Sequence, residues 1–169
     1  MYLQIPGRPA ERVLDVRLDD LAGRIFVVSQ LGELPEKSLG ELLSAVPRSD
    51  SPDRASLESL LDLVGLAKPL DACAGHLSGG ERQRFKTARL LRSPAKVWVL
   101  DEAFSALDIP SAETLTCLLL ARAKDCGATL LFVTHNQKLE TLFDSKLILT
   151  RSTVAEALVE VKLQGSGGD

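Results

Sequence analysis

The sequence contains no long apolar run, no dense basic segment and no cysteine pair of the kind that binds metal. No stretch approaches the roughly 20 apolar residues of a membrane-spanning helix, and the N-terminus lacks a signal-peptide pattern. The formal net charge is -3, which gives no sign of a nucleic-acid surface. Cys73, Cys117 and Cys126 lack Cys-x-x-Cys spacing, so we expect reduced thiols rather than disulfides or metal ligands.

Short apolar runs alternate with helical patterns along the chain. Runs of four apolar residues predict buried strands at 25–28, 97–100 and 129–133, and a further strand is expected at 146–150. An alternating pattern predicts a half-buried strand at 14–18. Helical spacing predicts helices that begin near Ser51-Pro52, Ser78 and Ile109 and end near Gly65, Pro94 and Gly127; residues 154–163 fit a helix or a strand. Strands that alternate with helices predict an α/β fold, with a mostly parallel sheet and flanking helices.

Polar side chains follow three of the predicted strands. They are Gln30, Asp101, Glu102 and His135. In open parallel sheets, ligands bind at the loops that follow the carboxyl ends of the strands. We therefore expect a ligand site at this edge of the sheet.

Ser78, Gly79 and Gly80 open one predicted helix and precede Glu81. The first N–H groups of a helix lack intrahelical partners and lie at its positive dipole end, so they attract anions. Glycine lets the backbone approach phosphate oxygens closely, and a serine hydroxyl adds a donor. The alternative is a structural serine cap followed by a glycine turn, and these residues alone do not decide between the two.

Asp101 and Glu102 close the apolar run at 97–100. A carboxylate at a strand end is a hard oxygen ligand that suits Mg²⁺, and Asp101 is the candidate. Glu102 points elsewhere and can orient an attacking water or accept its proton. His135 ends a strand expected beside that of Asp101, within reach of a terminal phosphate, and Gln30 is a candidate for binding the metal or the water.

In this order, the motifs resemble the ATPase domain of ATP-binding cassette (ABC) proteins. The matching features are a glutamine loop at Gln30, a signature at 77–81, a Walker B strand ending at Asp101-Glu102, a loop at 105–108 and a switch histidine at His135. The resemblance covers residues 13–150. It implies the C-terminal part of a P-loop NTPase domain, including the helical signature subdomain, with ATP and Mg²⁺ as cofactors.

The resemblance also implies a role for each candidate residue. Catalysis is expected of Glu102, His135 and Gln30, and metal binding of Asp101 and Gln30. Nucleotide binding is expected of Ser78, Gly79, Gly80, Glu81 and Asp108. In this family ATP lies between two domains, so Ser78, Gly79 and Gly80 are expected to act on the nucleotide of a partner domain.

The same resemblance predicts the organisation and the partners. Residues 1–163 are expected to form one partial ABC ATPase domain, with a helical signature subdomain at about 35–93, and residues 164–169 a flexible tail. The predicted partners are a second ABC ATPase domain, in a head-to-tail dimer, and a membrane-spanning transporter subunit, with no nucleic acid. The expected location is cytoplasmic, peripheral on the inner face of a membrane through those partners.

One element of the family is missing from this sequence. The Walker A loop, Gly-x-x-x-x-Gly-Lys-Ser/Thr, is absent, since none of the twelve glycines precedes a lysine. Only 29 residues precede Gln30, and they match the part of the family that follows the Walker A helix. We therefore expect the isolated chain to bind ATP weakly and to hydrolyse it negligibly.

Residues 34–41 resemble the exporter-type members of the family, so an exporter-like transporter ATPase is the leading hypothesis. Two alternatives stay open. The first is the C-terminal lobe of a chromosome-maintenance or DNA-repair ATPase, although no heptads are present. The second is a non-catalytic partner half that lends its signature to another subunit. Outside the site, Trp98 is expected in the core, and Arg82, Arg84 and Arg89 on a solvated helix face.

Overall fold

The computed structural model describes residues 2–3, 11–12, 23–29, 32–47, 52–143, 145–150 and 160–165 of the 169-residue chain. The chain divides into two compact units, residues 1–133 and residues 134–169. Gln30 and the strand predicted at 14–18 lie outside the described residues. Within the residues that are described, no helix is both long and apolar enough to cross a bilayer.

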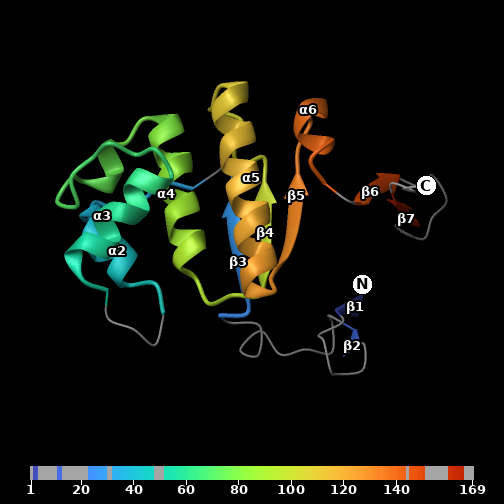
Figure 1. Ribbon diagram of the computed structural model, residues 1–169, viewed down its shortest axis with the longest axis horizontal. Coiled ribbons are helices and arrows are strands. Elements are labelled where there is room, and N and C mark those ends of the chain that lie inside the picture. The colour runs from blue at the N-terminus through green and yellow to red at the C-terminus, as the bar shows by residue number, and fades with distance from the viewer. Residues whose placement is uncertain are drawn as a thin grey trace. The chain divides into compact units, whose positions relative to one another are not determined.

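The centre of the first unit is a three-stranded sheet, as the apolar runs predicted. Its strands are β3 (Ile25–Ser29), β4 (Val97–Asp101) and β5 (Thr129–Val133), in the order β3-β4-β5. Both pairings are parallel, so the α/β fold with a parallel sheet is confirmed (Figure 1). The register places Ser29 opposite Asp101 and Asp101 opposite Val133. The polar strand ends of β3 and β4 therefore lie at the same edge of the sheet.

The two faces of this sheet differ in burial. One face carries Trp98 and Leu100 of β4, which are fully buried, and it is covered by helices that contact β3 and β5. On the opposite face Val27, Leu131 and Val133 are about half exposed, at 59%, 48% and 49%. Because parallel sheets are normally covered on both faces, this second face is an apolar surface without a covering layer among the described residues.

The helices described in the first unit are α2 (Leu39–Ser44), α3 (Arg54–Leu63), a short 3₁₀ turn η2 (Ala74–His76), α4 (Gly79–Arg92) and α5 (Ile109–Cys126). Helices α4 and α5 contact the sheet, and α2 and α3 pack against α4 (Figure 1). In α4 the predicted apolar face is confirmed, because Phe85, Ala88 and Leu91 are buried. Helix α5 begins with a proline in its first turn and ends at Gly127, as predicted.

The predicted start of α3 was wrong by two residues. Pro52 was expected at the first helical position, but Asp53 is the N-cap and the helix begins at Arg54. The carboxylate of Asp53 accepts a hydrogen bond of 2.8 Å from the N–H of Ser56. An aspartate that accepts this bond is a stronger start signal than a proline two residues before the helix.

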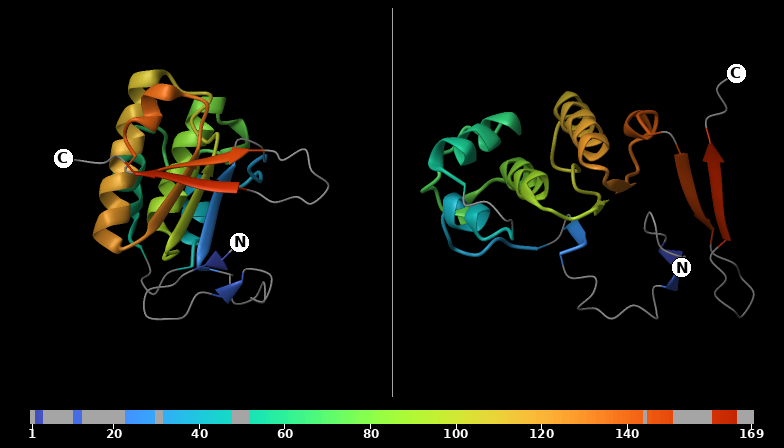
Figure 2. Two further views of the ribbon diagram at one scale, coloured as in Figure 1. Left: turned by 90° about the vertical axis from the view of Figure 1, so that its right-hand side faces the viewer. Right: turned by 60° about the horizontal axis from the view of Figure 1, so that its bottom comes forward.

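The remaining strands form two small antiparallel pairs. In the first unit β1 (Tyr2–Leu3) pairs with β2 (Glu11–Arg12). The second unit contains α6 (Gln137–Glu140) and a hairpin of β6 (Ser145–Thr150) and β7 (Glu160–Gly165) (Figure 2). The tail predicted from residue 164 therefore begins too early, since Gln164 and Gly165 pair with Lys146 and Ser145. Residues 160–163, left open between helix and strand, are a strand.

Candidate functional site

The N-terminus of α4 is closed by a reciprocal serine–glutamate cap. The Ser78 hydroxyl accepts a bond of 3.4 Å from the N–H of Glu81, and the Glu81 carboxylate accepts one of 2.9 Å from the N–H of Ser78. Glu81 also forms an ion pair of 3.1 Å with Lys68. The bond from the Ser78 N–H, followed by the bonds from Lys68 and the Ser78 hydroxyl, lowers the pKa of Glu81. This capping box is the structural alternative considered for the motif, and it is present.

The cap leaves two N–H groups of the first helical turn open. Those of Gly79 and Gly80 have no acceptor among the described residues, and Gly79 is exposed. Two adjacent donors at the positive end of a 14-residue helix are suited to an anion. Capping and anion binding are therefore compatible here, because they use different atoms.

The loop that follows β4 packs closely against the two glycines. A Cβ atom at Gly79 would lie 3.3 Å from the Cβ of Ala106. At Gly80 it would lie 3.2 Å from a methyl carbon of Leu107 and 3.3 Å from the carbonyl oxygen of Ala106. The glycine pair therefore permits a tight contact within the chain, whatever its role toward a ligand.

Two acidic residues lie where β4 ends and that loop begins. Asp101 is exposed at the end of β4, and Glu102 is half-buried. Glu102 has φ 46°, the left-handed region that non-glycine residues rarely adopt, and its N–H donates to the carbonyl of Val133 at 3.0 Å. The carboxylates are thus held by an unusual turn at the strand end and do not lie in the packed interior.

Asp108 closes the loop and caps α5. Its carboxylate accepts a bond of 3.1 Å from the N–H of Ser111. Hydrogen bonds from the hydroxyl and N–H of Ser111, with a smaller effect of the Arg84 charge, lower the pKa of Asp108. Arg84 in turn donates to the Ser111 hydroxyl at 2.8 Å. Asp108 is therefore connected to α4 through Ser111 and Arg84.

The sequence analysis did not predict a role for Gln83 and predicted the wrong environment for three arginines of α4. Gln83 is only 6% exposed and binds the loop through both ends of its amide. The solvated face predicted for Arg82, Arg84 and Arg89 is wrong: all three are partly buried, and Arg84 bonds to Val64 and Ser111. Helical spacing offered a signal for Gln83, because it lies four residues before the buried Thr87.

Gln30 and His135 are the two remaining candidates for the catalytic site. Gln30 follows Ser29, which lies opposite Asp101, but is itself outside the described residues. His135 belongs to the second unit, where it is exposed and precedes Asn136, the cap of α6. The proposed roles of both residues stay predictions.

Asp101 fits a metal ion that arrives with a nucleotide. In the described part of the chain, no group of three His, Cys, Asp or Glu side chains is arranged to hold a metal. A Mg²⁺ ion needs one or two carboxylates when phosphate oxygens and water complete its shell. A single exposed carboxylate such as that of Asp101 suits this kind of site better than a metal site built from protein alone.

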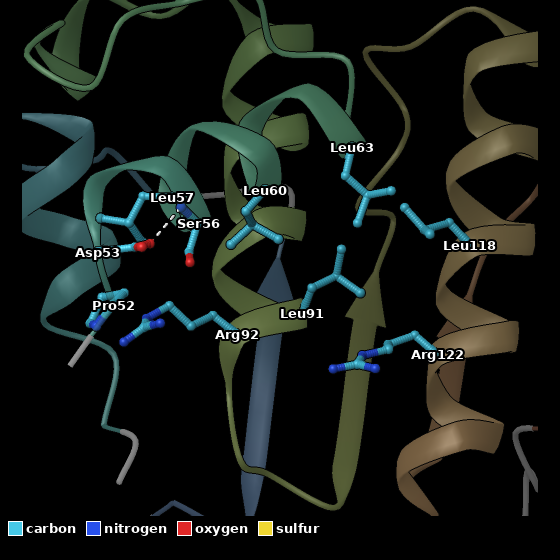
Figure 3. Close-up of a pocket in the computed structure, with 10 residues that line it drawn as sticks. All are labelled: Pro52, Asp53, Ser56, Leu57, Leu60, Leu63, Leu91, Arg92, Leu118 and Arg122. Carbon is cyan, nitrogen blue, oxygen red and sulfur yellow. Dashed lines mark hydrogen bonds between the residues drawn. The ribbon is translucent and has the colours of Figure 1, made fainter. Parts of the chain in front are cut away.

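A groove of about 580 Å³ lies among α3, α4 and α5 (Figure 3). Leucines from all three helices line it, and Arg92 and Arg122 lie beside them. Leu63 is 56% exposed there. The Arg92 guanidinium donates to the Leu43 carbonyl at 2.9 Å, which joins α4 to α2. The groove therefore combines leucine side chains with the charged groups of Asp53, Arg92 and Arg122.

Comparison with known proteins now assigns the family. A family model described as ABC transporter matches residues 4–105. The chain is 40% identical over 108 residues to the thiamine import ATP-binding protein ThiQ of Vibrio parahaemolyticus, covering 63% of this chain and 44% of that protein. It is 40% identical over 126 residues to the methionine import ATP-binding protein MetN of Streptomyces coelicolor, covering 74% and 34%. The chain belongs to the ABC transporter family.

Solved structures show the same fold. One is described as an ABC transporter ATP-binding protein from Pyrococcus furiosus, with a TM-score of 0.61, 24% identity, and coverage of 72% of this chain and 62% of that one. A bacterial Atm1-family ABC exporter with ATP bound gives a TM-score of 0.69 and 23% identity, covering 82% and 26%. The chain spans less than half the length of ThiQ and MetN. The exporter-like type is not confirmed, since both of these relatives are named for import.

Proposed function

We propose that the chain is the signature-bearing part of an ATP-binding domain that couples ATP binding and hydrolysis to transport across a membrane. The main support is the pair of open N–H groups at Gly79 and Gly80, beside the loop that carries the acidic residues. The names of the relatives, both ATP-binding proteins of transporters, support the same conclusion. Their import function favours import over the export predicted from residues 34–41.

In this proposal Ser78, Gly79 and Gly80 bind phosphate oxygens of a nucleotide held by a second ABC ATPase domain. Asp101 and Gln30 would hold Mg²⁺, which neutralises phosphate charge. Glu102 would orient the attacking water, with His135 near the terminal phosphate, and Glu81 and Asp108 would support the nucleotide side. Glu81 would do so through its cap, because its carboxylate is already bonded to Ser78 and Lys68.

The groove among α3, α4 and α5 is our candidate for the membrane-spanning partner, which would hold the chain at the inner face of a membrane. A docking segment there needs apolar side chains for the leucines and a carboxylate for Arg122, which is exposed. Replacing Leu63 by glutamate should reduce co-purification with that subunit. The matched control is Ser59→Glu, which adds the same charge at an exposed position of α3 outside the groove lining and should not reduce it. Equal binding by Leu63→Glu would contradict the assignment.

The nucleotide proposal is tested by titrating the ¹⁵N-labelled chain with Mg-ATP. We expect the amide signals of Gly79 and Gly80 to shift, and those of Leu39 and Gly40 to stay fixed, because the latter N–H groups already have acceptors. Binding should be weak, in the millimolar range, because the sequence holds no Gly-Lys pair. Shifts at Leu39 and Gly40 equal to those at Gly79 and Gly80 would contradict the phosphate site. Micromolar affinity would contradict the predicted impairment.

The head-to-tail arrangement needs a second subunit. Mixed with the intact Vibrio ThiQ protein, which shares 40% identity over the aligned region, the chain should raise ATP turnover above that of ThiQ alone. The Gly80→Ala variant, which alters the signature corner, should not raise it. Equal stimulation of ThiQ by the wild-type chain and by Gly80→Ala would show that the signature of this chain does not take part.

A further inference from the structure

Gln83 connects the glycine corner to the acidic loop, and nothing above assigns it a function. Its amide nitrogen Nε2 donates to the Ser105 hydroxyl at 3.3 Å, and its oxygen Oε1 accepts from the N–H of Ala106 at 3.0 Å. The side chain is 6% exposed. A buried amide with both ends paired is costly to disturb, because any unpaired group loses its bond without regaining water.

The Gln83 hydrogen bonds matter for the loop because few hydrogen bonds within the loop hold its backbone. Within it, the N–H of Ser105 donates to Glu102 at 3.2 Å and that of Leu107 to Phe104 at 3.1 Å, but Ala106 depends on Gln83. Its first residue, Glu102, also has the uncommon positive φ. Backbone held in a sparsely populated conformation persists when surrounding contacts enforce it.

Gln83 also lies one turn from the glycines that face the same loop. Gly79 and Gly80 lie so close to Ala106 and Leu107 that a Cβ atom at either position would push its neighbours by a few tenths of an ångström, and Gln83 binds the same loop. A shift of the loop would therefore move Ser105 and Asp108 relative to the open N–H groups of α4.

We propose that Gln83 is a positioning residue that fixes the Ser105–Asp108 loop against the Ser78–Gly80 corner, so that both face one nucleotide. This inference rests on the proposed function, since it assumes that the two segments share a ligand. Gln83 itself contacts no phosphate. It acts through the N–H of Ala106 and the hydroxyl of Ser105.

The test compares three variants of the full chain by amide hydrogen exchange. Gln83→Met keeps the side-chain size but removes both bonds, and should raise the exchange rate of the Ala106 amide about tenfold. Gln83→Glu keeps an acceptor for Ala106, and the Ser105 hydroxyl can donate to its carboxylate, so it should restore most of the protection. Thr87→Val is the matched control: it removes a buried polar bond to the Gln83 carbonyl on the same helix without touching the loop.

A second measurement uses the Mg-ATP titration. In Gln83→Met, the shifts of Gly79 and Gly80 should remain while those of Ser105 and Asp108 are lost. If Gln83 had only a general structural role, Gln83→Met would weaken the Mg-ATP shifts of both residue pairs equally, and Thr87→Val would do the same. Such an equal loss would overturn the proposal, and so would an unchanged exchange rate of the Ala106 amide in Gln83→Met. If the wild-type chain shows no shifts at Gly79 and Gly80, the proposed nucleotide site is wrong. The exchange rate of the Ala106 amide still tests whether Gln83 holds the loop in place.

Discussion

Two helices of this chain begin with the same cap and differ in what the cap leaves open. Ser38 and Glu41 form a capping box at α2, as Ser78 and Glu81 do at α4. At α2, the next two N–H groups donate to the carbonyls of Ala72 and Leu70, at 3.0 and 2.8 Å. At α4, the equivalent groups belong to Gly79 and Gly80 and have no acceptor in the described part of the chain.

The difference shows that the capping motif carries no functional information by itself. Both boxes stabilise their helices in the same way, although only the α4 box is followed by N–H groups without acceptors among the described residues. What separates α4 is the second and third residue of the motif. At α2, the N–H groups of a leucine and a glycine are bonded to loop carbonyls. At α4, two glycines pack against the acidic loop, and their N–H groups have no acceptor within the part of the chain that the structure describes.

The first helical position gives the largest expected contrast. Leu39 is fully buried, so Leu39→Ala should lower the free energy of unfolding by about 2–5 kcal/mol in urea denaturation. Leu39→Met, which keeps the volume, should cost less than about 1.5 kcal/mol. Gly79 occupies the same position in α4 but is exposed, so no core depends on it. A small loss in Leu39→Ala would mean that α2 is not anchored as described.

Alanine at the second helical position should have opposite effects in the two helices. In Gly80→Ala the new Cβ would meet the Ala106 carbonyl at 3.3 Å and Leu107 at 3.2 Å, so we expect a loss of about 1–3 kcal/mol. In Gly40→Ala the nearest atoms, both of Leu70, lie at 3.4 Å, an ordinary contact. That variant should gain up to about 1 kcal/mol from helix propensity. Thermal unfolding of both measures the sign, and a stabilised Gly80→Ala would refute the close contact.

Removing the cap should separate stability from nucleotide response. Ser38→Ala and Ser78→Ala should each lower stability by about 1 kcal/mol, because each loses the acceptor for a glutamate N–H. Only Ser78→Ala should reduce the Mg-ATP shifts at Gly79 and Gly80. If Ser38→Ala reduces them as much, the two ends are not functionally different.

The smallest expected effect concerns the two cap glutamates. Their pKa values are lowered, first by the bond from the serine N–H; Lys68 then acts on Glu81 alone. Since the folded-state pKa is depressed, each cap contributes fully above the usual glutamate range, and its contribution is lost as the pH falls through the lower folded value. In Lys68→Met, carboxyl NMR titration should show a higher pKa for Glu81 and an unchanged one for Glu41. Equal shifts in both would contradict the ion pair.

Much of the framework could be predicted from local pattern. The apolar runs predicted β3, β4 and β5, because a run of four or five such residues fits a strand buried in a parallel sheet. The burial of Trp98 and the end of α5 at Gly127 also followed from spacing and from turn residues. These features depend on neighbours in sequence, which pattern analysis can read.

The features that could not be predicted depend on contacts between distant segments. Gln83 and Ser105 are 22 residues apart, and Arg84 and Val64 are 20 apart. The helical pattern predicted a solvated position for Arg84 and predicted no role for Gln83, because the partners of both side chains lie in other segments. The acceptors that seal the start of α2, at Leu70 and Ala72, likewise come from a segment with no regular spacing to it.

The chain has a single tryptophan, and its position makes it an internal optical reporter. Trp98 is 1% exposed and its indole N–H donates to the Ala95 carbonyl at 2.9 Å. It lies three residues before Asp101 on the strand that ends at the acidic pair. Intrinsic fluorescence can therefore follow unfolding of β4 without any label, in the wild-type chain and in every variant considered above.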